Sequence, residues 1–234
     1  MFIFDPMYLI MVGPAMLLAF WAQWMVKSAF ANGKQYPSRS GMTGAQVAQR
    51  ILEAYNIEHV GIEPAQGFLG DHYDPRRKVL RLSPEVYGGR DLAALGVAAH
   101  EVGHAIQDAK GYAPLVLRNG LVPLANVGSQ FSTILIIVGL VLMYLSQQIG
   151  MAVAIAGVLF FGVVVLFQLI NLPVEFDASS RARRILVDMS IISESENRVV
   201  GRVLNAAAMT YVAATITALM QLLYFLYIIL ERRR

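Results

Sequence analysis

Two histidines four residues apart, with a glutamate beside the first, are the residues in this sequence best suited to chemistry. They lie in "VAAHEVGHAIQ" (residues 97–107) as His100, Glu101 and His104. On a helix, side chains four apart face the same way, about 5–6 Å from each other, so both histidines can bind one zinc ion at about 2.0–2.1 Å. Glu101, about 100° round the helix, can take a proton from a zinc-bound water. The spacing therefore predicts two zinc ligands and a general base, the H-E-x-x-H pattern.

A core helix that carries polar groups by chance is the alternative. Gly103 argues against it, because a glycine inside a helix costs roughly 1 kcal/mol relative to alanine. A pair of core histidines needs neither this glycine nor the adjacent glutamate. The small residues of the segment would instead let another backbone, or a substrate, approach closely, and we favour the metal site.

A third ligand has to come from elsewhere, because catalytic zinc usually takes three protein ligands and a water. The chain has no cysteine, so His and carboxylate groups are the available donors. "NLPVEFDASSRARR" offers Glu175 and Asp177, in a helix that Pro173 suits as a start. Two residues turn about 200° along a helix, so both cannot face one metal. The longer Glu175 reaches further, and Ser179 shares its face and could bond to the ligand carboxylate. Alternatively, Glu175 pairs with Arg181 or caps the helix.

The composition indicates a membrane protein. Hydrophobic residues make up 56% of the 234 residues and charged residues 15%, against roughly 45–50% and about 25% in soluble domains. The formal net charge is +3, but the basic residues are dispersed without clustered aromatics, so a nucleic-acid partner is not expected. The absence of cysteine also excludes disulfides.

Three long regions without charge predict about four membrane spans. Residues 6–26 and 203–230 are each long enough for one span of about 20 residues, and residues 119–174 for two, separated by the polar "SQQIG" as a tight hairpin. The small residues "AFA" at 29–31 resemble a signal-peptidase site, but no basic residue precedes the first apolar run, which favours a retained anchor.

The region between the first span and the hairpin has the pattern of a small folded domain. "GMTGAQVAQRILEAYNI" predicts an amphipathic helix with Thr43 as N-cap and Gln46 completing a capping box. "GDHYDPRRKVLRLSPEVY" predicts a β-hairpin or short strand pair around the Asp74–Pro75 turn. "RDLAALGVAAHEVGHAIQDA" predicts a helix with Asp91 as N-cap.

The fold class we expect is a mainly α integral membrane protein, about four transmembrane helices with a small α+β zincin-like catalytic domain. A chain that crosses the membrane and returns places His100, His104 and Glu175 on the same side. The expected segments are an N-terminal anchor (1–30), the catalytic domain with the HEVGH helix (31–118), the transmembrane hairpin (119–174), a helical segment with the third ligand (175–202) and a C-terminal transmembrane helix (203–234).

Four segments, in this order among the spans, resemble the YugP-type membrane zinc peptidases of bacteria: "AAHEVGHAIQ", "DHYDPRRKVLRLSPEVY", "LVPLANVGS" and "PVEFDASSRA". More distantly, the plan is similar to the HtpX-type membrane proteases. The resemblance implies peptidase activity, Zn²⁺ and Glu175 as the third ligand. In the distant group an Asp follows the ligand glutamate by four residues, whereas this chain has Ser179 there, which puts the orientation of the ligand in doubt.

Other residues are weaker candidates. The strand "KVLRLS" could bind an extended substrate along a free edge, or only support the helix. His72, Tyr73 and Tyr112 are candidates for stabilising the transition state. His72 could also be a spare metal ligand, with a surface-loop role as its alternative. The expected partners are the lipid bilayer and polypeptide substrates, and the sequence leaves the oligomeric state open.

Three functions fit a metal site in a membrane protein. The first is a zinc endopeptidase acting on membrane or membrane-proximal proteins, with Glu101 as base and then proton donor. The second, a metal transporter or sensor, needs ionisable groups in the spans, which have none. The third is a catalytically silent scaffold, against which an intact Glu101 argues.

We expect a multi-pass protein of the cell membrane whose catalytic face is cytoplasmic. Lys27, Lys34 and Arg39 follow the first span and nothing basic precedes it, which favours this side. The arginines at 232–234 argue for the opposite orientation, but the first helix usually dominates.

Overall fold

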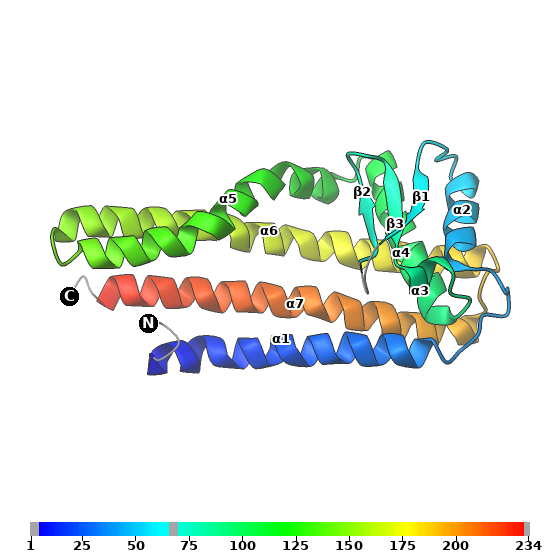
Figure 1. Cartoon of the computed structure of the whole chain (residues 1–234), viewed down its shortest axis with the longest axis horizontal. Coiled ribbons are helices and arrows are strands. Elements are labelled where there is room, and N and C mark those ends of the chain that lie inside the picture. Colours follow the sequence, from blue (N-terminus) through cyan, green and yellow to red (C-terminus); the bar gives the residue numbers. More distant parts are fainter. Residues whose placement is uncertain (1–4, 66–69, 232–234) are drawn as a thin grey trace. The chain divides into compact units, whose positions relative to one another are not determined.

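A computed structural model describes residues 5–65 and 70–231 of the chain and is mostly helical (Figure 1). Within these ranges the elements are α1 (Pro6–Gly33), α2 (Gly44–Ala54), β1 (Gly61–Pro64), β2 (His72–Asp74), β3 (Val79–Leu82), α3 (Pro84–Tyr87), α4 (Leu92–Ala109), α5 (Ala113–Leu142), α6 (Gln147–Asp188) and α7 (Glu194–Glu231). They form two units. The first, which we call the membrane unit, contains residues up to Trp21, Leu117–Leu172 and those from Tyr211 on. The second contains Ala22–Val116 and Pro173–Thr210, and we call it the catalytic unit because it carries the residues expected from the sequence to form the site.

The helices α1, α5, α6 and α7 are, in the described part of the chain, the four that are long and apolar enough to cross a membrane. The four spans expected from the sequence match these helices. The 42 residues of α6 extend about 63 Å at about 1.5 Å per residue, roughly twice the hydrocarbon thickness of about 30 Å. Part of α6 must therefore lie outside the hydrocarbon core.

One helix boundary expected from the sequence is wrong. Pro173 lies inside α6 and does not begin a new helix. Proline removes one backbone donor and usually ends a helix in water, but helices that cross membranes tolerate it when neighbours satisfy the freed groups. Pro14 in α1 and Pro123 in α5 are further examples in this chain. The segment that carries Glu175 is thus a direct continuation of the second hairpin helix.

Small residues bring α5 and α6 together in the membrane unit. A Cβ added at Gly139 would lie 2.7 Å from the Cα of Ala154, and one at Gly157 would lie 2.8 Å from the carbonyl oxygen of Ser132. Such close approach is how helices associate in lipid, where apolar side chains gain little from meeting each other. The tight hairpin predicted from "SQQIG" is confirmed, with α5 ending at Leu142 and α6 beginning at Gln147.

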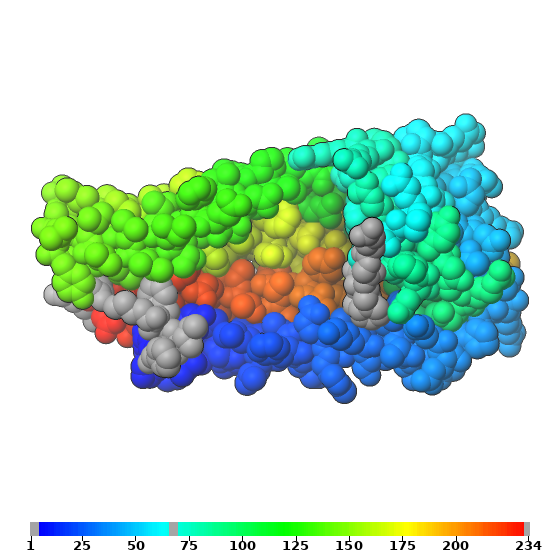
Figure 2. All heavy atoms as spheres, in the orientation of Figure 1, coloured from blue at the N-terminus to red at the C-terminus, as the bar shows by residue number. Residues whose placement is uncertain are grey.

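The catalytic unit builds α4 against a small sheet, with the strand order β1-β3-β2. β1 pairs parallel and β2 antiparallel with β3, so three strands replace the predicted pair. Of the two roles considered for "KVLRLS", binding of substrate along a free edge is wrong, because this segment forms β3, the central strand. Side chains of α2, the strands and α3 make one continuous surface, coloured blue to teal in Figure 2.

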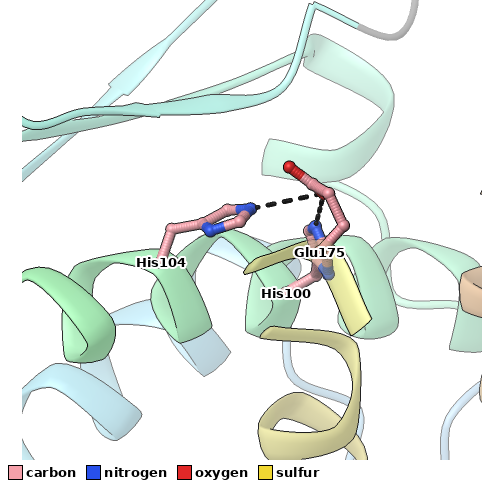
Figure 3. Close-up of side chains that lie close together, drawn as sticks. All are labelled: His100, His104 and Glu175. Atoms are coloured by element: carbon pink, nitrogen blue, oxygen red, sulfur yellow. Dashed lines mark ion pairs between the residues drawn. The ribbon is translucent and has the colours of Figure 1, made fainter. Parts of the chain in front are cut away.

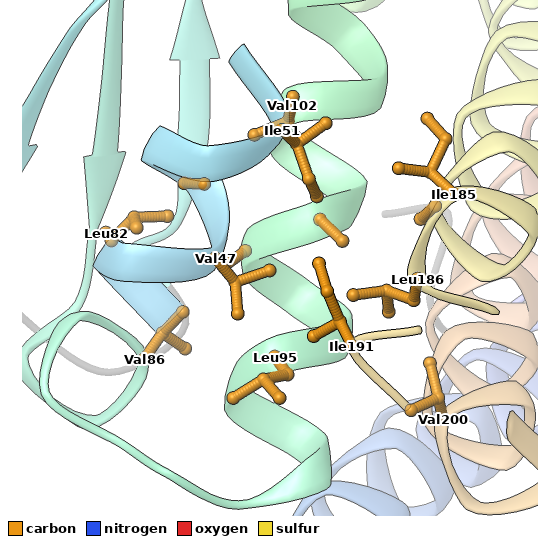
Figure 4. Close-up of a cluster of buried hydrophobic side chains, with 14 of the residues drawn as sticks. Val47, Ile51, Leu82, Val86, Leu95, Val102, Ile185, Leu186, Ile191 and Val200 are labelled. Carbon is orange, nitrogen blue, oxygen red and sulfur yellow. The ribbon is translucent and has the colours of Figure 1, made fainter. Parts of the chain in front are cut away.

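Capping and apolar burial hold these elements. Both halves of the predicted capping box of α2 are present between Thr43 and Gln46. The predicted N-cap Asp91 accepts a hydrogen bond from the backbone of Ala94 at the start of α4. Apolar side chains from α2, β3, α4, α6 and α7 form the core of the unit (Figure 4), among them Val47, Ile51, Leu82, Leu95, Val102, Leu186 and Val200. The motif helix is therefore packed on several sides.

Candidate metal centre

Close packing of α4 on α6 positions the motif. A Cβ added at Gly103 would lie 2.8 Å from the carbonyl oxygen of Ala178 on α6 and 3.2 Å from its Cα. No other residue type allows the two backbones this distance, which confirms the expectation that the small residues of the motif admit a second backbone. The approach brings the turn of α6 that begins at Glu175 next to the histidines of α4.

The structure brings His100, His104 and Glu175 together in one cluster (Figure 3). Oε2 of Glu175 lies 3.3 Å from Nε2 of His100 and 3.6 Å from Nε2 of His104. Ligands about 2.0–2.1 Å from a tetrahedral zinc ion are about 3.3–3.4 Å apart. The candidate ligand atoms all lie within 4.8 Å of one another. Two imidazoles and a carboxylate at these separations fit a zinc ion with one position left for water or substrate.

Glu101 is buried next to this cluster but points to the sheet. Its Oε2 accepts a hydrogen bond of 3.0 Å from the backbone N–H of Tyr73 in β2, and the residue is 7% exposed. Burial raises its pKa to about 7, with the neighbouring carboxylates Glu175 and Asp71 adding to the rise, while His100 and the Tyr73 hydrogen bond oppose it. A carboxyl group with a pKa near neutrality can both accept and return a proton.

Each histidine has a polar partner on the ring nitrogen that faces away from Glu175. Nδ1 of His100 lies 3.1 Å from Oγ of Ser179, and Nδ1 of His104 lies 2.9 Å from Oε1 of Gln107. The sequence predicts the Glu175 carboxylate as the partner of Ser179, whereas in the structure the bond is to His100. Partners of this kind orient metal-binding imidazoles.

Gln107 is a site residue that the sequence analysis missed. It is fully buried on α4, and it bonds through Nε2 to the backbone oxygen of Val174 and to Asp177 on α6. The available signal is its position three residues after His104, which places it on the face of the motif. Asp177, an alternative ligand in the sequence, accepts from Gln107 and Arg181.

The three candidates for transition-state stabilisation have other contacts. The hydroxyl of Tyr73 donates to Oδ2 of Asp108 at 2.6 Å, and burial together with this bond raises its pKa. His72 is exposed, with Nδ1 2.8 Å from the backbone oxygen of Gly70. The guanidinium of Arg181 lies 5.7 Å from the centre of the Tyr112 ring. A role in transition-state stabilisation stays a prediction for all three.

These features are those expected of a candidate H-E-x-x-H metal centre, in a protein with membrane-length helices. The chain belongs to the family described as "Putative neutral zinc metallopeptidase", whose model matches residues 8–230. It is 46% identical over 219 residues to the "Putative membrane protease YugP" of Bacillus subtilis (strain 168), covering 94% of this chain and 95% of the relative. The resemblance to YugP-type peptidases seen in the sequence is thereby confirmed. No solved structure matches the chain.

Proposed function

We propose that this chain is a membrane-embedded zinc-dependent endopeptidase that hydrolyses peptide bonds of membrane or membrane-proximal proteins. The observation that carries the proposal is the buried cluster of His100, His104 and Glu175 with Glu101 beside it. The family and the relative named above support the same activity. We further propose that the α4–sheet arrangement is zincin-like.

The chemistry of the donors suits zinc, since the two nitrogens and one carboxylate oxygen are the ligands of many catalytic zinc sites. When bound, Zn²⁺ lowers the pKa of a water molecule and polarises a substrate carbonyl. His100, His104 and Glu175 would hold the ion. The remaining steps belong to the side chains around it.

Glu101 would move the proton. Its carboxylate takes a proton from the attacking water and returns it to the leaving amine. Burial, which raises the pKa of this carboxyl above its usual range, favours its role as the proton carrier. The Tyr73 N–H holds one carboxylate oxygen, Oε2, and leaves Oε1 for the reaction. Burial of the site keeps bulk water from competing for the proton.

We propose that the protein is a multi-pass protein of the cell membrane with its catalytic unit on the cytoplasmic side. The support is the group of basic residues after the first span, Lys27, Lys34 and Arg39. Reporter fusions after residue 60 and residue 234 measure the side of the two positions directly. A periplasmic or extracellular reporter at residue 60 would reverse this assignment and leave the chemistry unaffected.

The test of the activity compares four variants of the full chain in detergent or vesicles. Glu101→Gln is expected to retain zinc and lose about 10²–10⁴-fold in casein or peptide hydrolysis. His100→Ala is expected to lose both zinc and activity. The matched control is Glu58→Gln, an exposed carboxylate that is expected to change neither.

The fourth variant tests the third ligand. Glu175→Ala is expected to retain much less zinc by metal analysis. Normal zinc content in this variant would move the third ligand to Asp177 or His72. Unchanged hydrolysis by Glu101→Gln would exclude the mechanism. Zinc binding without hydrolysis in the unmodified protein would favour the alternatives, a metal-binding membrane protein or a catalytically silent scaffold.

A further inference from the structure

Gln107 is a buried side chain that the proposed reaction does not use, yet it contacts both helices of the metal site. It is 0% exposed. Nε2 donates to the backbone oxygen of Val174 and to Oδ2 of Asp177, at 2.8 Å in each case. Oε1 lies 2.9 Å from Nδ1 of His104. The amide thus uses both of its N–H groups and its oxygen.

The partners of Nε2 fix the direction of the amide. A backbone carbonyl and an ionised carboxylate only accept hydrogen bonds, so the amide nitrogen has to face Val174 and Asp177. The amide oxygen then faces His104 and cannot donate, so Nδ1 of His104 has to carry the hydrogen. In the neutral imidazole this leaves the lone pair on Nε2, the nitrogen that lies 3.6 Å from the Glu175 carboxylate.

We propose that Gln107 is the positioning residue of the metal site. The inference rests on the proposed zinc function and adds the side chain that orients two of its ligands, His104 and Glu175. Gln107 selects the tautomer of His104 that can bind metal through Nε2. Its bond to Val174 ties the same side chain to the residue that precedes Glu175, so one amide aligns the second and third ligands. Asp177, paired with Arg181, keeps the amide from turning over.

His100 shows why Gln107 is the more decisive partner. The partner of His100 is the hydroxyl of Ser179, which can donate or accept and therefore permits either tautomer. The Gln107 amide lacks this freedom, because both partners of its Nε2, the Val174 carbonyl and the Asp177 carboxylate, only accept hydrogen bonds. Its oxygen must therefore face His104 as an acceptor. The two histidines are held by different means, and the stricter one acts on His104.

The first part of the test measures zinc affinity by competition with a chelator. Gln107→Leu removes every bond of the amide at similar volume, and we expect zinc affinity to fall about 10–100-fold. Gln107→Glu leaves an acceptor for His104 but places a carboxylate against Asp177 and the Val174 carbonyl, so affinity falls as well. Adding Asp177→Asn supplies a donor to that carboxylate, and we expect at least fivefold recovery in the double variant.

A second measurement separates positioning from a merely structural role and does not need zinc. In metal-free protein labelled with ¹⁵N-histidine, His104 is expected to give the shifts of a single tautomer protonated on Nδ1. In Gln107→Leu we expect a mixture of tautomers, and in the double variant a return towards one. These shifts report the ring directly, so they remain informative if the leucine variant is less stable.

The proposal would be overturned by a zinc affinity of Gln107→Leu within twofold of that of the unmodified protein, or by His104 shifts that are the same in these two proteins. Lack of rescue by Asp177→Asn, with the single Gln107→Glu variant folded, would also contradict it. Failure of the peptidase proposal gives different outcomes. In that case the unmodified protein binds no zinc, or Glu101→Gln stays active. In either case the tautomer of His104 would still depend on position 107.

Discussion

Two threonines of the membrane unit and the polar side chains around the candidate site of the catalytic unit differ in where their short hydrogen bonds go. In the membrane unit the hydroxyls of Thr215 and Thr217 have their short bond, 2.8 Å, to the carbonyl oxygen four residues earlier in their own helix. Their contacts to carbonyl oxygens of other helices, Gln168 on α6 and Ala15 on α1, are longer, at 3.4 and 3.3 Å. In the catalytic unit the bonds run between elements, from β2 to Glu101 and from Gln107 on α4 to α6. A bond within one helix satisfies a polar group without fixing a neighbour, whereas a bond between elements sets where the neighbour lies.

This difference in hydrogen bonding suggests that polar groups of the membrane unit affect mainly stability, whereas those of the catalytic unit also affect the candidate metal site. The membrane unit relies on close contact of small and apolar side chains, with a core that includes Val12, Ile136, Ala154 and Phe225. The catalytic unit has an apolar core too, but the bonds of Glu101, Gln107 and Ser179 surround the candidate metal centre. Changes of polar groups should therefore remain local in the first unit and reach the metal site in the second.

Removal of the metal gives the largest expected contrast. A ligand present at about 1,000 times its Kd stabilises the state that binds it by about 4 kcal/mol. We therefore expect a chelator to increase hydrogen exchange more than tenfold in α4 and in residues 173–185. Exchange in residues 128–160 of the hairpin is expected to stay unchanged.

Mass spectrometry of peptides from the two regions makes this measurement. Glu175→Ala is the control, because a protein that has already lost the ion cannot respond to the chelator. Equal loosening of the hairpin would show that the units respond together, and the contrast would be wrong.

Glycine-to-alanine variants in the two units test whether closer helix packing affects zinc retention as well as stability. Gly103→Ala is expected to destabilise the protein by about 1–3 kcal/mol and to reduce zinc retention, because the added Cβ meets the Ala178 carbonyl. Gly139→Ala meets the backbone of Ala154 and should cost a similar amount without affecting zinc. Thermal unfolding in detergent and metal analysis provide the two readouts.

Gly162→Ala is the matched control, since nothing lies within 4 Å of an added Cβ there. It should leave both readouts unchanged or slightly raise the melting temperature, because alanine favours helix. Loss of zinc from Gly139→Ala would contradict the separation of the two units.

Much of this architecture is visible in the sequence because it follows from local or periodic signals. The spans follow from uncharged length, and the caps at Thr43 and Asp91 from residue types beside apolar periodicity. The pairing of His100 with His104 follows from helical spacing alone. Glu175 follows from the hairpin, which returns the chain to the side it left.

The rest depends on contacts that only the folded chain makes. A three-residue strand such as β2 has too few residues for a periodic signal, and the parallel pairing of β1 with β3 joins segments 18 residues apart, Gly61 and Val79. Pro173 has the signal of a helix start, but the preceding span continues through it. The role of Gln107 depends on Val174 and Asp177, whose approach no spacing within α4 predicts.

Tyr73→Phe has a smaller expected effect, which tests how β2 supports Glu101. The variant loses the 2.6 Å bond to Asp108 but keeps the backbone N–H that bonds to Glu101. We expect about 0.5–1.5 kcal/mol less stability, unchanged zinc content and a kcat reduced by less than tenfold. Tyr55→Phe, at an exposed ring, is the control. A kcat as low as that of Glu101→Gln would instead assign the Tyr73 hydroxyl to the reaction itself.

Ser132→Ala has the smallest expected effect and tests the membrane side of the comparison. Ser132 is fully buried on α5, and among the described residues its Oγ has no hydrogen-bond partner. Removing a buried hydroxyl that bonds to nothing leaves no acceptor or donor behind, so stability should stay within about 0.5 kcal/mol or rise. Zinc content and hydrolysis should match the unmodified protein. If Ser132→Ala lost as much zinc as Gln107→Leu, buried polar groups of both units would affect zinc binding, and the comparison would be wrong.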